Sequence, residues 1–166
     1  MSEFKPEEIL RILAEHEVRY VLIGGLAATL YGMAAPTFDV DITPEMSLEN
    51  LSRLSAALKA LDARIRVDGI PEGLPFSHDA ASLRDMSTLN LATGYGPLDI
   101  ASQPAGVSRF DDWDADAAEI VVSGVHVRLA SLEDIVKSKE AAGRDKDKAQ
   151  LPLLRALLER LRRSGS

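Results

Sequence analysis

Apolar residues in this chain follow two spacings. A recurrence every three or four positions is typical of amphipathic helices, and it occupies 5–15, 26–31, 47–61, 131–143 and 145–161, with a shorter helix indicated near 78–84. Short apolar or alternating runs are typical of strands, and they occupy 21–23, 38–42, 63–67, 86–93, 97–101, 120–122 and 125–129. Residues 68–75 have the composition of a Gly/Pro-rich loop, and 110–117 form an acidic segment.

This order of elements predicts an α/β (α+β) fold in which helices back a sheet. Glycine-bearing turns at 94–96 and 123–124 join two pairs of strands into hairpins, which makes the predicted sheet mixed. We expect one domain over 1–166, with a core over about 1–130 and a C-terminal helical pair over about 131–163.

The helical pair has recognisable ends. Ser131 with Asp134 is a capping box in its aspartate form, and Gly143 is a typical C-cap. Pro152 either kinks the second helix or marks its true first turn.

Candidate chemistry gathers between Val21 and Pro44. A buried strand runs into Gly24 and Gly25, where a tight turn exposes backbone N–H groups at the start of a helix, an arrangement that favours phosphate. Asp39 and Asp41 lie two apart on the next strand, so both carboxylates project from one face, opposite Phe38, Val40 and Ile42. Paired carboxylates beside a phosphate site indicate Mg²⁺.

A third carboxylate is expected to join this pair. Asp99 stands between Leu98 and Ile100 in the second strand of a predicted hairpin, so its side chain points to the face opposite theirs. By contrast, His16, His78 and His126 show no metal-ligand or catalytic spacing, which predicts structural or exposed roles.

Three motifs in order resemble the nucleotidyltransferase superfamily, and the AbiEii-type and MenT-type toxin nucleotidyltransferases in particular. These motifs are IGGLAATLYG, APTFDVD and SLEDIVKSKEAAGRDKD, and the resemblance extends from Val21 to about Leu154. It implies a nucleotidyltransferase fold and transfer of NMP from an NTP to an acceptor hydroxyl. In the toxins the acceptor is the tRNA 3′ end, and a partner antitoxin neutralises the enzyme.

The resemblance also implies roles for residues. Asp39, Asp41 and Asp99 would hold Mg²⁺, Gly24 and Gly25 would bind phosphates, and Lys139 would contact the triphosphate, with Lys137 as the alternative lysine. Arg144 and Lys146 read as helix-end charges.

Three positions depart from the pattern of the resembling family. Ala35 replaces an arginine, Gln150 replaces an aspartate and Gly25 replaces a frequent serine. These departures leave two other functions open: an enzyme for a small acceptor such as an aminoglycoside, or a degenerate nucleotide-binding partner protein.

Composition and charge limit where the protein can act and what it can bind. The chain has no cysteine, which excludes disulfides, and no run approaches the roughly 20 apolar residues of a membrane span, so we expect a cytoplasmic protein. The net charge of −7 argues against a general nucleic-acid binder, yet residues 1–130 carry −10 whereas 131–166 carry +3. The basic C-terminal third could therefore meet a polyanion. The sequence indicates no oligomeric state.

Overall fold

The computed structural model describes residues 3–107 and 109–164, which form a mixed sheet with helices on both faces. The strands are β1 (Tyr20–Ile23), β2 (Val40–Pro44), β3 (Arg64–Val67), β4 (Ile70–Leu74), β5 (Thr88–Thr93), β6 (Gly96–Ala101), β7 (Ala118–Val122) and β8 (Val125–Leu129). The helices are α1 (Pro6–Glu15), α2 (Gly24–Leu30), α3 (Leu48–Ala60), α4 (Ala80–Arg84), α5 (Phe110–Ala115), α6 (Leu132–Ala142) and α7 (Asp145–Ser164).

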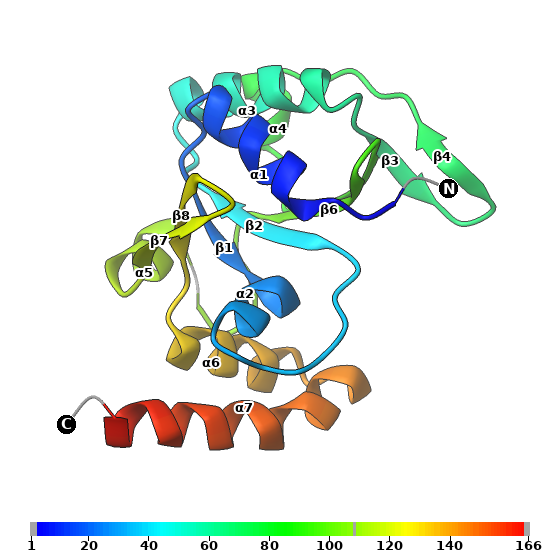
Figure 1. The fold of residues 1–166 in the computed structure, drawn as a ribbon. Coiled ribbons are helices and arrows are strands. Elements are labelled where there is room, and N and C mark those ends of the chain that lie inside the picture. The colour runs from blue at the N-terminus through cyan, green and yellow to red at the C-terminus, as the bar shows by residue number, and fades with distance from the viewer. Residues whose placement is uncertain (1–2, 108, 165–166) are drawn as a thin grey trace.

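The eight strands of the described residues are ordered β4-β3-β5-β6-β2-β1-β8-β7. The pairs β2/β6 and β1/β8 are parallel and the others are antiparallel, so the predicted mixed α/β fold with a C-terminal helical pair is confirmed. Figure 1 shows α1, α3 and α4 on one side of the sheet and α2, α6 and α7 on the other. All four residues of β1 are buried, as expected for a central strand that is covered on both faces.

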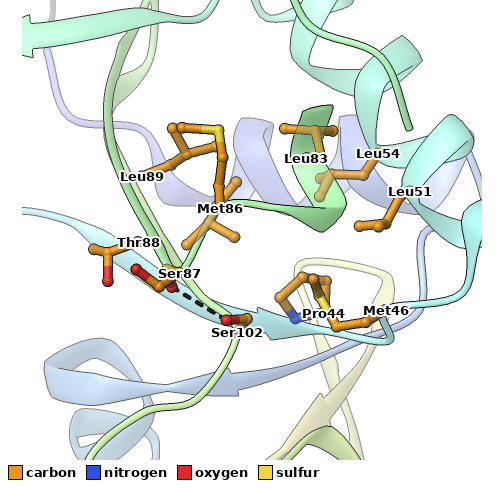
Figure 2. A pocket seen from close by; sticks show the side chains of 11 residues that line it. Pro44, Met46, Leu51, Leu54, Leu83, Met86, Ser87, Thr88, Leu89 and Ser102 are labelled. Carbon is orange, nitrogen blue, oxygen red and sulfur yellow. Dashed lines mark hydrogen bonds between the residues drawn. The ribbon is translucent and has the colours of Figure 1, made fainter. Parts of the chain in front are cut away.

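Part of the hydrophobic core lies between the sheet and helices α1 and α3. The helical spacing in α1 buries Ile9, Leu10, Ile12 and Leu13, and α3 contributes Leu51, Leu54 and Leu58. A small hollow remains between α3, α4 and the sheet, lined by side chains such as Leu54, Leu83 and Met86 (Figure 2). Its volume of about 10 Å³ is room for about one water. It is too small to hold a nucleotide.

One sequence prediction of irregular structure is wrong, and the acidic segment, for which no element was predicted, contains a helix. Residues 70–74, predicted as loop, form β4, which pairs with β3 at the sheet edge. An edge strand tolerates Pro71 because one side of its backbone needs no partner. The acidic segment begins with α5, a helix that buries Phe110 and Trp113 three residues apart. Two apolar positions are too few to show helical periodicity in the sequence.

Three boundaries also differ. Strand β2 begins at Val40, so Phe38 precedes it and is 72% exposed instead of sharing the apolar face of Ile42. Helix α2 begins at Gly24 itself and not at Leu26. Pro152 lies inside α7, which excludes its reading as a first turn. Among the described residues, no helix is long and apolar enough to cross a membrane.

Candidate active site

Three carboxylates meet where β2 and β6 run in parallel. Asp41 on β2 is the register partner of Asp99 on β6, and Asp39 directly precedes β2. One oxygen of each side chain lies within 4.8 Å of the others. The structure thus brings together all three carboxylates that the sequence analysis singled out.

The cluster is electrostatically strained without a cation. Burial, together with the negative charges of Asp39 and Asp99, raises the pKa of Asp41 from 3.8 to about 8. Burial also raises the pKa of Asp99, and Asp39 adds to that shift while Arg66 opposes it. A divalent cation relieves such repulsion and prefers oxygen ligands. The donor set therefore fits a hard metal ion, although it does not identify one.

The glycine turn packs directly against this cluster. Gly24 has a φ of +76°, and a Cβ there would lie 2.8 Å from both Cβ and Cγ of Asp41, closer than real Cβ atoms come to other carbons. Gly25 is different, because a Cβ there would meet Thr37 Cγ2 at an ordinary 3.5 Å. Sterically, glycine is therefore required at position 24. At position 25 there is room for a Cβ, so the glycine that replaces the family's frequent serine is not required by space.

A cleft of about 720 Å³ opens above the carboxylates and the turn. The loop before β2 lines it with Thr37 and Phe38, and the segment after β6 lines it with Gln103. Helix α6, the turn after it and helix α7 complete the cleft through Lys139, Arg144, Lys146 and Gln150. Negative and positive side chains therefore face the same space, as a metal–triphosphate ligand requires.

The structure separates the two candidate lysines. Lys139 lines the cleft and its side chain is only 13% exposed, whereas Lys137 is exposed and is not among the cleft residues. Residues two apart on a helix point about 200° away from each other, so a single helix can aim one of them at the cleft. The structure therefore does not bring Lys137 to the site.

Asp147 is a buried anchor that the sequence analysis missed. Its side chain is fully buried, accepts hydrogen bonds from Arg144 Nε at 2.7 Å and Nη2 at 3.3 Å, and lies 3.5 Å from Lys139 Nζ. Burial alone would raise the pKa of Asp147, but the Arg144 hydrogen bond and the two nearby cations outweigh it and lower the pKa. Asp147 thus ties the last turn of α6 to the first turn of α7.

Arg66 is a second contact missed from the sequence. Its Nη2 donates to Asp99 Oδ1 at 2.8 Å and its Nη1 donates to the backbone oxygen of Leu91 at 3.2 Å. No spacing in the sequence could reveal this pair, because β3 and β6 become neighbours only through β5.

The histidines make local contacts outside the cleft. His16 Nδ1 lies 2.9 Å from the backbone oxygen of Ile12, His78 Nδ1 lies 2.7 Å from Ser55 Oγ, and the exposed His126 pairs with Glu119.

A model of the family of nucleotidyltransferases of unknown function (DUF6036) matches residues 6–157. The chain therefore belongs to this nucleotidyltransferase family, and the resemblance to that superfamily is confirmed, whereas an AbiEii or MenT subtype is not shown. No curated protein matches the chain in sequence.

Solved structures share the fold at low identity. The lincomycin-bound lincosamide antibiotic adenylyltransferase LnuA is 19% identical over 94% of this chain and 99% of its own, with a TM-score of 0.61. ANT(2″)-Ia in complex with adenylyl-2″-tobramycin is 18% identical over 97% of each chain, with a TM-score of 0.56. The Thermotoga maritima protein TM1012 is 17% identical over 96% of this chain and 97% of its own, with a TM-score of 0.53.

The raised Asp41 pKa gives a pH-dependent stability. Without metal, folded protein holds this proton up to about pH 8, whereas the unfolded chain releases it near pH 4. Stability contributed by this group is therefore complete below about pH 4 and is lost as pH rises through about 8. In EDTA, we expect the Tm of the parent to fall between pH 5 and 8 by at least about 2 °C more than that of Asp41→Asn.

Added Mg²⁺ at pH 8 should raise the Tm of the parent but not that of the variant. If the Tm values of the parent and of Asp41→Asn change with pH in parallel, the carboxylates of the cluster do not destabilise the metal-free protein.

The two glycines form a matched pair for the turn. Gly24→Ala introduces a Cβ against Asp41 at a positive φ, so it should weaken binding of a non-hydrolysable NTP with Mg²⁺ at least about tenfold. Gly25→Ala meets only Thr37 at contact distance and should leave that affinity within about threefold. Calorimetry on both variants checks this, and equal losses would show that the turn is not limited by the Asp41 contact.

Proposed function

We propose that the protein transfers NMP from an NTP to a hydroxyl at the 3′ end of tRNA, as the toxin of a toxin–antitoxin pair. The observation that carries the transfer chemistry is the Asp39–Asp41–Asp99 cluster facing Lys139 and cations of α7 across one cleft. The acceptor is supported by the ordered sequence motifs and by the basic balance of residues 131–166.

Each group of site residues has a role in the proposed transfer. Bound Mg²⁺, for which Asp39, Asp41 and Asp99 are the ligands, would supply charge neutralisation to the triphosphate and lower the pKa of the acceptor hydroxyl. Backbone N–H groups at Gly24 and Gly25 and the ammonium of Lys139 bind phosphate oxygens.

Asp99 orients the acceptor hydroxyl for attack. The acceptor oxygen forms a bond to the α-phosphorus while the bond from that phosphorus to the bridging oxygen breaks. Pyrophosphate leaves with the electron pair of that bond, and the hydroxyl proton passes to Asp99 and then to solvent.

A small acceptor is the second candidate. LnuA and ANT(2″)-Ia match this chain over nearly the whole of both lengths, and their structures hold lincomycin and an adenylylated tobramycin. The acidic balance of residues 1–130 favours a cationic acceptor of this kind.

Incubation with each labelled NTP, Mg²⁺ and either total cellular RNA or a panel of aminoglycosides and lincosamides separates the candidates. Label on tRNA supports the first proposal. Label on a drug and on no RNA overturns it in favour of a small acceptor.

Loss of one cluster carboxylate tests the chemistry. Asp41→Ala removes a metal ligand and relieves repulsion, so transfer should fall at least about 1,000-fold while the fold persists. Circular dichroism checks that the fold persists and a labelling assay measures transfer. The control is Asp62→Ala, at an exposed residue. Near-parental labelling by the Asp41 variant would refute the assignment.

Surface cations of α7 test the tRNA acceptor. Arg144 and Lys146 line the nucleotide cleft, so they cannot report on RNA alone, whereas Lys148 and Arg160 are exposed outside it. Reversal of both Lys148 and Arg160 to glutamate should weaken tRNA binding, lower its salt slope by about two and leave NTP affinity unchanged. Lys59→Glu, on α3 across the sheet, is the control. An unchanged salt slope would exclude this helix from RNA contact.

A further inference from the structure

Arg66 reaches the carboxylate cluster from an unexpected direction. It lies on β3, which is separated from β6 by β5, so its side chain must span β5 to meet Asp99. Adjacent strands lie about 4.8 Å apart, so the side chain crosses roughly 10 Å of sheet surface. Two hydrogen bonds fix the extended side chain, one to the backbone oxygen of Leu91 on β5 and one to Asp99 on β6.

The geometry of these bonds fixes the guanidinium. Its two terminal nitrogens donate to different acceptors, at 3.2 Å to the Leu91 oxygen and at 2.8 Å to Asp99 Oδ1. A planar guanidinium held at two points has little rotational freedom. A lysine ammonium group with one attachment would not be restrained in this way. The orientation of Asp99 is therefore set from outside the carboxylate cluster.

Arg64 on the same strand shows that this contact is specific. Arg64 lies two residues before Arg66 on β3, and the pairing of β3 with β4 shifts register between Ile65 and Val67. Among the described residues, the ion-pair partner of Arg64 is Asp62, at 3.5 Å, and Asp62 is 81% exposed. Asp99 is 19% exposed, so the Arg66 pair is the more shielded of the two.

We propose that Arg66 is a positioning residue for nucleotidyl transfer, which occupies Oδ1 of Asp99 so that Oδ2 alone serves the reaction. A carboxylate with both oxygens free can rotate or chelate a cation with both atoms. A carboxylate with one oxygen committed presents a single acceptor in a single direction, which favours one geometry of hydroxyl attack. The inference rests on the transfer chemistry but not on the identity of the acceptor.

Because Arg66 is positively charged, its removal should change metal binding and turnover in opposite directions. A guanidinium beside Asp99 disfavours a nearby divalent cation, so its removal should strengthen metal binding. Loss of orientation should nevertheless slow the reaction. Tighter metal binding combined with slower turnover is the signature of positioning, since a purely structural residue would weaken both.

The experiment uses the full chain and needs no identified acceptor. We would measure Mn²⁺ affinity by calorimetry without nucleotide, and pyrophosphate release from ATP with Mn²⁺ and water as the acceptor. Arg66→Met keeps an unbranched stem without the donors, Arg66→Lys keeps the charge without the fork, and Arg64→Met is the matched control.

Arg66→Met should bind Mn²⁺ at least as tightly as the parent while kcat falls at least about 30-fold, with KM for ATP within about threefold. Arg66→Lys should keep parental Mn²⁺ affinity and remain at least about fivefold slow, because one ammonium cannot hold both acceptors. Arg64→Met should match the parent in every measurement.

A kcat for Arg66→Met within threefold of the parent would overturn the inference. So would a loss of Mn²⁺ affinity together with a lowered Tm, which would make Arg66 a structural tie for β3. If the parent releases no pyrophosphate from ATP with water, the same comparison is made with each NTP and with total RNA or the drug panel as the acceptor, and no release in any of these would overturn the proposed transfer. In that case a lowered Mn²⁺ affinity of Arg66→Met would still overturn the inference about Asp99.

Discussion

Repulsion among three carboxylates is the constraint on which the rest of this site depends. The parallel register of β2 and β6 places Asp41 beside Asp99, and the residue before β2 adds Asp39. Burial of Asp41, together with proximity of this kind, favours its protonation, and the raised pKa of Asp41 shows that cost. A divalent cation with its bound phosphates would convert the same repulsion into affinity.

The neighbouring elements are arranged around that cluster. Gly24 leaves the space that a side chain would take from Asp41, and Arg66 restrains Asp99 from across β5. On the opposite wall, the buried Asp147 fixes Arg144 beside Lys139, so that α6 and α7 present their cations at the cleft. A buried carboxylate with two cationic partners is costly to break, which makes this junction a rigid support.

Local pattern predicted the parts of this structure that local forces determine. Helical spacing in α1 and α3, the hairpin of β5 and β6, and the alternation that turns Asp99 away from Leu98 were all readable in the sequence. The Arg66–Asp99 pair joins residues that are 33 positions apart, and burial of Asp147 depends on how α7 packs on α6. Edge strand β4 was hidden for a related reason, since its proline and glycine are tolerated only because of its place in the sheet.

The central claim is that Asp39, Asp41 and Asp99 together hold the metal that positions the nucleotide. The most direct measurement is anomalous diffraction from crystals soaked with Mn²⁺ and a non-hydrolysable NTP. The account predicts Mn²⁺ peaks bonded to oxygens of all three carboxylates, with the triphosphate running from them toward Gly24 and Lys139. Mn²⁺ peaks elsewhere, or a triphosphate bound away from the carboxylates, would contradict it.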